Sequence, residues 1–142
     1  MSQDLQDIHD VGQVIIRYAT SVDKRDFDRY GSCFTEDAEI SGFSSGDVVG
    51  RDNWVSFVVK ALEAFRGTHH QITNQEISVD GDTAHMRSYV QATHESADDD
   101  SSLIILWAVY DDELVRTSQG WQISRHVLER LIRSKRVPTL PL

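Results

Sequence analysis

The spacing of the apolar residues changes once along this chain of 142 residues, close to Gly67. Before that point apolar side chains recur every three or four positions, which is typical of amphipathic helices. Beyond it they recur at every second position, which is typical of strands with one buried face. Helices followed by a run of strands predict an α+β fold, with the helices packed on one face of a sheet.

Three helices are expected in the first part of the chain. A short second helix would carry Phe27, and a third would begin at Asp52 or Asn53 and end at Gly67. The first and longest is defined by an apolar stripe that consists of Ile8, Val11, Ile15, Tyr18 and Val22.

Long antiparallel strands are expected in the second part of the chain. Asp80-Gly81-Asp82 is a strong hairpin signal between the first two strands. Residues 98–102 and 118–120 are polar turns between the others. The last ten residues, 133–142, contain both prolines and are expected to form an irregular tail. The length and the absence of any linker indicate that residues 1–142 form a single domain.

Composition and charge exclude several classes of protein and site. The net charge of −9, from 23 acidic and 14 basic residues, disfavours nucleic-acid binding, which requires a basic face. No stretch approaches the roughly 20 apolar residues of a membrane span, and the N-terminus lacks a secretory signal, so we expect a cytoplasmic protein. Cys33 is the single cysteine, so neither a disulfide nor a thiolate metal site is expected. No other metal-ligand spacing occurs, and we expect no metal or cofactor.

A strongly bent sheet closed by helices would enclose a pocket, and strand alternation predicts which side chains face it. Along residues 83–95, His94 shares a face with Ala84, Met86, Ser88, Val90 and Ala92. Along residues 103–117, Arg116 shares a face with Leu106, Ala108, Tyr110 and Leu114, and is a candidate anion-binding group. His69 and His70 point to opposite faces of their strand, and the sequence does not decide which of them points inward.

Asp23 lies where the apolar stripe of the first helix ends. A carboxylate that contacts an imidazole forms a general-base pair, because the acid orients the ring and the ring takes the proton. Aspartate is also common at helix ends and in turns, where its role is structural, and histidines, arginines and tyrosines often have structural roles too. The residues alone therefore leave a structural and a catalytic interpretation of Asp23 open.

Several segments, taken in chain order, resemble the SnoaL-like branch of the NTF2-like superfamily. They span roughly residues 5–132 and read "IIRYATSVDKRDFDRYGSCFTEDAEI", "VVGRDN", "GTHHQITN", "VDGDTA" and "GWQISRHVLERL". The resemblance implies an α+β cone, in which three N-terminal helices pack against a highly curved, mostly antiparallel sheet that encloses a pocket.

Within that branch the chain looks most like scytalone dehydratases and lindane dehydrochlorinases. "SVDKRD" would place the family aspartate at Asp23, and "THHQITN" would place the catalytic histidine at His70. "VQATHES" would place a second histidine at His94, and "AVYDDELVRTSQGW" a pocket arginine at Arg116. These relatives are cofactor-free lyases, and the resemblance implies a homo-oligomer, either a trimer or a dimer.

The expected function is therefore that of a lyase of dehydratase or eliminase type, acting on a small hydrophobic cyclic substrate. Scytalone dehydratases carry two tyrosines that handle the departing hydroxyl. This chain has Val22 at the position of the first and Gly42 near the position of the second. Two alternatives remain: an isomerase or polyketide-type cyclase with the same Asp–His pair, and a non-catalytic small-molecule-binding module. The candidate substrate contacts are Tyr18, Phe43, Met86, Trp107 and Tyr110.

Overall fold

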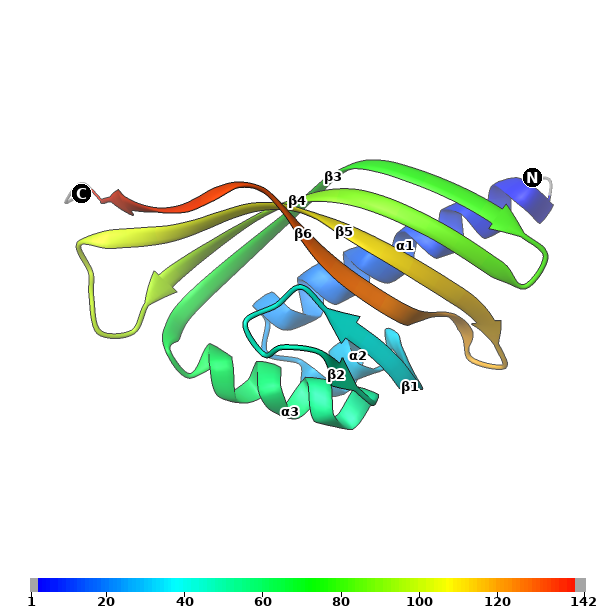
Figure 1. Cartoon of the computed structure of the whole chain (residues 1–142), viewed down its shortest axis with the longest axis horizontal. Helices are drawn as coiled ribbons and strands as arrows, with labels where there is room; N and C mark the ends of the chain where they lie inside the picture. The colour runs from blue at the N-terminus through cyan, green and yellow to red at the C-terminus, as the bar shows by residue number, and fades with distance from the viewer. Residues whose placement is uncertain (1–2, 140–142) are drawn as a thin grey trace.

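Three helices pack on one sheet of six strands in the computed structural model, which describes residues 3–139 (Figure 1). The strands are ordered β2-β1-β6-β5-β4-β3. This arrangement confirms the expected α+β cone. In chain order the elements are α1 (Gln3–Asp23), α2 (Phe27–Gly31), β1 (Phe34–Ser41), β2 (Val48–Val49), α3 (Arg51–Leu62), β3 (Phe65–Asp80), β4 (Thr83–Ser96), β5 (Ser102–Thr117) and β6 (Gly120–Pro138).

Helix α1 forms because its apolar residues recur at helical spacing and can be buried together. Val11, Ile15, Tyr18 and Val22 are each at most 3% exposed, and the helix packs chiefly on β3. Figure 1 shows α1 crossing one face of the sheet. The end of α1 lies beside the beginning of β3, where Thr68 and the His70 backbone N–H donate hydrogen bonds to Asp23.

The four long strands β3 to β6 pair antiparallel, and the short β1 runs parallel to β6. Register shifts interrupt the β3–β4 pairing between Thr73 and Glu76 and the β5–β6 pairing near Trp107. Such irregularities bend strands and increase their twist, which explains the strong curvature of the sheet in Figure 1. The hairpin at residues 80–83 and the turns at 96–102 and 117–120 lie where they were expected.

Strand alternation on β4 also agrees with the prediction. Ala84, Met86, Ser88, Val90 and Ala92 are all buried on the inner face.

Three boundaries were wrong. The third helix ends at Leu62, and Gly67 lies inside β3, because Phe65 and Gly67 already pair with the end of β4. The N-cap of this helix, α3, is Gly50 and not Asp52 or Asn53. Residues 133–138 are not an irregular tail, since β6 stays paired with β5 up to Pro138, opposite Ser102. Thr139 follows the strand, with its backbone N–H donating to the Ser101 carbonyl at 2.9 Å, and residues 140–142 of the predicted tail lie outside the described residues.

No helix within residues 3–139 is long and apolar enough to cross a membrane. Cys33 is a buried free thiol.

Candidate active site

A cavity of about 200 Å³ lies between the helices and the inner face of β3, β4 and β5. Among its described lining residues there is no Lys, Arg, Asp or Glu, and the two imidazoles are those of His70 and His94. The cavity is therefore lined mainly by aromatic side chains, with two imidazoles in one wall. Its aromatic residues are Tyr18, Tyr30, Phe43, Trp54, Phe57, Phe65 and Tyr110.

Asp23 and His70 meet at this wall, where the end of α1 lies beside the beginning of β3. The Asp23 Oδ1 atom is 2.7 Å from His70 Nδ1, and Asp23 Oδ2 accepts a 2.8 Å hydrogen bond from the His70 backbone N–H. The His70 side chain is 9% exposed and that of Asp23 is 20% exposed. A carboxylate at Nδ1 assigns the ring proton to that nitrogen, which leaves Nε2 as the basic atom.

Asp23 is held in its ionised form. Burial raises the pKa of this carboxyl, but hydrogen bonds from the His70 ring, the His70 backbone and the Thr68 hydroxyl outweigh burial and leave the pKa below its ordinary value. A carboxylate at neutral pH can both orient the imidazole and stabilise the imidazolium that forms when the ring takes a proton. The pair therefore has the geometry and the charge of a general-base unit.

His94 lies in the same wall, with its ring centroid 5.9 Å from that of His70 and 4.8 Å from that of Phe65. Burial, and then the neighbouring His70, lower the pKa of His94, which therefore stays neutral at neutral pH. Tyr18, Phe43 and Tyr110, three of the expected substrate contacts, also line the cavity.

The structure does not bring Arg116 to this cavity. Its guanidinium donates two hydrogen bonds to Asp7, at 2.9 and 2.8 Å, and one to Asp82 at 2.9 Å. It also lies 4.4 Å from the centre of the Trp121 ring. Tyr110 is the β5 lining residue nearest to Arg116 in the chain, and Arg116 follows it by six residues, which corresponds to about 20 Å along a strand. Arg116 therefore ties the N-terminal part of α1 to a hairpin and cannot contact a ligand beside His70.

Met86 and Trp107 do not line the cavity either. Met86 is on the inner face but is fully buried, opposite Asp112 in the β4–β5 pairing. Trp107 alternates with the inward-facing Leu106 and lies on the other face of the sheet, where its Nε1 donates to Gln91 at 3.1 Å. Sequence alternation could have excluded Trp107, because its neighbours in the chain were already assigned to the inner face.

Sequence reasoning missed a second Asp–His pair. Asp112 of β5 and His126 of β6 are paired positions, both 0% exposed, with Oδ1 and Nδ1 2.5 Å apart. Burial raises the pKa of Asp112. In the part of the chain that the structure describes, neither Asp112 Oδ2 nor His126 Nε2 has a hydrogen-bond partner. Four rings surround His126, namely Tyr18, Phe34, Phe43 and Tyr110.

A signal for this pair was present in "AVYDDEL". Asp112 falls between Tyr110 and Leu114 in the alternation, so a carboxylate interrupts an otherwise apolar inner face. A buried carboxylate requires a partner, and the search for one would have led to His126.

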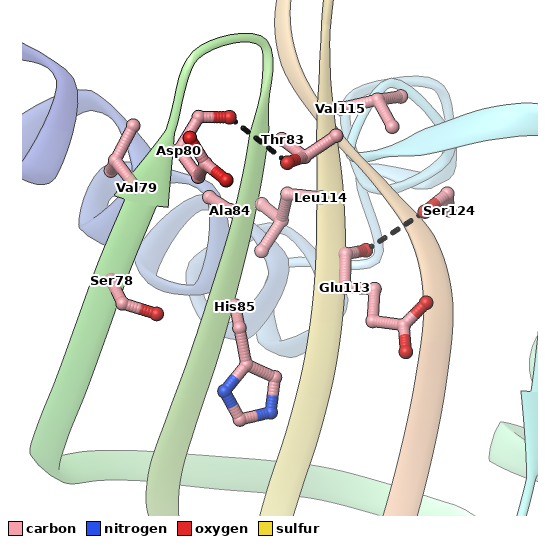
Figure 2. A pocket seen from close by; sticks show the side chains of 10 residues that line it. All are labelled: Ser78, Val79, Asp80, Thr83, Ala84, His85, Glu113, Leu114, Val115 and Ser124. Carbon is pink, nitrogen blue, oxygen red and sulfur yellow. Dashed lines mark hydrogen bonds between the residues drawn. The ribbon is translucent and has the colours of Figure 1, made fainter.

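A larger hollow, of about 440 Å³, lies near the hairpin that joins β3 to β4 (Figure 2). Half of its ten lining residues are exposed, and His85 contacts Asp111 through Nε2 at 2.9 Å. Figure 2 shows the Thr83 and Ser124 hydroxyls donating to the backbone oxygens of Asp80 and Glu113. The first bond closes the β3–β4 hairpin and the second joins β6 to β5, so both hydroxyls have a structural partner. The aromatic-lined cavity beside His70 is therefore the better candidate for a site, although it is smaller.

Comparison with known proteins gives a consistent result. The family described as SnoaL-like domain matches residues 3–127. An uncharacterized protein of Mycobacterium tuberculosis is 31% identical over 128 residues, which cover 87% of this chain and 85% of that protein.

Solved structures are similar over nearly the whole chain. A Novosphingobium aromaticivorans protein provisionally named an aromatic ring hydroxylase has a TM-score of 0.87 and 26% identity, with 96% of each chain covered. Another from that organism, provisionally named a scytalone dehydratase, has a TM-score of 0.84 and 25% identity, over 92% of this chain and 87% of the other. A third protein from that organism, described as NTF2-like with a cystatin-like fold, has a TM-score of 0.76 and 22% identity, over 89% of this chain and 83% of the other, which confirms the NTF2-like fold.

Proposed function

The chain belongs to the SnoaL-like domain family, and from that premise we propose that it is a cofactor-independent lyase of dehydratase or eliminase type. Its substrate would be a hydrophobic cyclic small molecule. The observation that supports this proposal is the 2.7 Å contact between Asp23 and His70 in the wall of an aromatic cavity.

The proposed reaction begins at Nε2 of His70. This atom takes a proton from the substrate carbon next to the one that bears the leaving group, and the C–H electron pair becomes the new double bond. The leaving group departs with its own bonding electrons, and Asp23 stabilises the imidazolium formed on His70. His94, in the same wall, would contact the leaving group, since Arg116 lies elsewhere.

The lining of the cavity supports a neutral, compact, cyclic substrate. Seven aromatic residues offer flat apolar surface, and among the described lining residues there is no Lys or Arg to compensate an anionic ligand. An anionic substrate would also be repelled by the net charge of −9.

One observation favours an isomerase or cyclase as the second candidate. The hydroxyls of Tyr18 and Tyr110 are 3.4 Å apart in the wall of the cavity, and burial raises both pKa values, so each keeps its proton. Protonated phenols can donate to an oxygen that becomes negative when a neighbouring carbon loses a proton. A proton could then return to the substrate without loss of a group. The mass of the product separates the candidates, because a lyase product is lighter than its substrate and an isomerase product is not.

The test combines a ligand search with two substitutions. A thermal-shift screen of neutral cyclic alcohols and enones identifies ligands, since binding raises the apparent stability. Turnover of each hit is then followed by mass spectrometry in the wild type, Asp23→Asn and His70→Ala. We expect each substitution to lower kcat by about 10²–10⁴-fold.

His69→Ala is the matched control, because His69 is the adjacent, exposed histidine on the opposite face of β3. It should retain wild-type turnover. If Asp23→Asn or His70→Ala is folded and turns over substrate like the wild type, the general-base pair is wrong. Binding without turnover of any hit would instead indicate a non-catalytic binding module. The cytoplasmic location and the homo-oligomer, a trimer or a dimer, stay predictions.

A further inference from the structure

Helix α1 ends in an unusual way, directly beside Asp23. The backbone N–H of Arg25 donates to the Val22 carbonyl at 3.1 Å, and the N–H of Asp26 donates to the Ser21 carbonyl at 2.9 Å. This pair of bonds is the Schellman motif, in which the residue at the Arg25 position is left-handed and is usually glycine. Arg25 has a φ of 61°, a conformation that is unfavourable for a residue with a side chain. A side chain is therefore kept where glycine would be more favourable.

The Arg25 side chain connects this helix end to the beginning of β3. Its Nη1 donates to the Val22 carbonyl at 2.9 Å and to Thr68 Oγ1 at 2.8 Å. Thr68 Oγ1 in turn donates to Asp23 Oδ1 at 2.9 Å. The order of these bonds is determined, because a guanidinium can only donate and a hydroxyl has one hydrogen. Arg25 therefore directs the Thr68 hydrogen toward Asp23.

These contacts restrict the Asp23 carboxylate at both oxygens. Oδ1 lies between the Thr68 hydroxyl and His70 Nδ1, and Oδ2 accepts the His70 backbone N–H. Asp23 is also the last residue of α1, whose final turn contains no basic residue. A carboxylate is disfavoured at the C-terminal end of a helix, where the dipole is negative, and the nearby guanidinium offsets that effect.

We propose that Arg25 and Thr68 form a positioning clamp that holds the Asp23 carboxylate against His70. The inference rests on the function proposed above. Neither residue is among those that line the cavity. Both are therefore positioning residues that act through Asp23, and they should affect kcat and not the binding of substrate.

Two substitutions remove the clamp with little disturbance of the fold. Arg25→Gly removes the side chain and retains the left-handed backbone, which glycine adopts readily. Thr68→Val removes the hydroxyl and retains a branched side chain suited to a strand. In both variants the pKa of Asp23 should rise. In Thr68→Val the carboxylate loses the hydroxyl that donates to it, and in Arg25→Gly it loses the guanidinium that orients this hydroxyl. The ¹³C NMR titration of the Asp23 carboxyl measures this without any substrate. With substrate, kcat should fall about tenfold or more at an unchanged KM, because misplacement of a catalytic pair is costly.

Asn74→Gly is the matched control for Arg25→Gly. Asn74 has a φ of 51° at the irregularity in β3, so the substitution makes the same backbone change away from Asp23. It should leave the Asp23 titration and kcat unchanged. Thr68→Ser keeps the hydroxyl and should restore both.

The possible results separate this inference from the proposed function. If Arg25→Gly and Thr68→Val fold, as judged by circular dichroism, and the Asp23 titration is the same as in the wild type, the clamp does not exist. If the Asp23 pKa rises and Asp23→Asn lowers turnover, but kcat of Arg25→Gly and Thr68→Val is unchanged, the clamp has no role in positioning for catalysis and the proposal is overturned. If the Asp23 pKa rises while Asp23→Asn keeps full turnover, the clamp holds Asp23 as inferred, and it is the general-base function that fails.

Discussion

Removal of His126 should destabilise the protein strongly, and removal of Asp112 together with His126 should restore much of the loss. Both side chains are 0% exposed and contact each other. The variant His126→Leu leaves the Asp112 carboxyl buried without its partner. The double variant Asp112→Val/His126→Leu replaces the pair by apolar side chains suited to the surrounding aromatic rings.

The magnitude follows from the burial of the pair. Breaking a buried ion pair by removing one partner costs about 3–5 kcal/mol, whereas replacing both partners by apolar groups is often close to neutral. The entropy of unfolding is about 2.1 cal/mol/K per residue, which for 142 residues is about 0.3 kcal/mol/K. His126→Leu should therefore lower Tm by about 10–17 °C. The double variant should lose less stability than the single one. It removes Asp112 Oδ2 and His126 Nε2, two buried polar atoms that lack partners among the described residues.

The loss should also depend on pH. Burial already raises the folded-state pKa of Asp112 above its ordinary value of 3.8, and loss of His126 raises it further. An acid whose folded-state pKa lies above its unfolded value binds its proton more tightly in the native state, so stability falls as pH rises through that interval. The deficit of His126→Leu should thus be larger at pH 7 than at pH 4.

Calorimetric unfolding of the wild type, both single variants and the double variant, at pH 4 and pH 7, measures these effects in one double-mutant cycle. A double variant that is as unstable as His126→Leu, or a deficit of the same size at both pH values, would refute the reasoning about desolvation.

Two further predictions concern positions away from the cavity. Gly42→Ala should lower the free energy of unfolding, measured in urea, by about 2–4 kcal/mol. Gly42 has a φ of 85°, and an added Cβ would lie 2.1 Å from the Leu128 carbonyl oxygen. A change within experimental error would contradict this backbone conformation. Arg116→Gln should lower Tm at pH 7 and leave kcat unchanged, since Arg116 bonds Asp7 and does not line the cavity. Arg116 lowers the pKa of Asp7 to about 2 from 3.8, so this loss of stability should disappear as pH falls through that range; a persistent deficit at pH 2 or a lower kcat would argue against this placement.

The order of elements and the family could be predicted from local signals. Helical spacing, the Asp80-Gly81-Asp82 hairpin and strand alternation depend on neighbours in the chain, and the expected α+β cone was correct. The resemblance led to Asp23 and His70, which the structure does bring together. Their catalytic role stays a proposal.

Element boundaries and the other site residues depended on contacts between distant segments. The tail prediction failed at 133–138 because pairing with β5 extends β6 as far as Pro138. Arg116 shares a strand face with Tyr110, but the length of β5 carries it to a salt bridge with Asp7. A strand face extends over many residues, whereas a site occupies only a few of them, and sequence alternation does not say which.

The chain's own periodicity thus determined which residues are helical, which are extended and which faces are apolar, because these properties arise between residues a few positions apart. Periodicity left the choice between His69 and His70 open, and the tertiary structure turns His70 toward Asp23 as the resemblance implied. Only the tertiary structure decided that Arg25 reaches Asp23 through Thr68 and that Asp112 meets His126. Each of these contacts joins different elements, and the sharp turn after α1 and the pairing of β5 with β6 bring their atoms within hydrogen-bond distance.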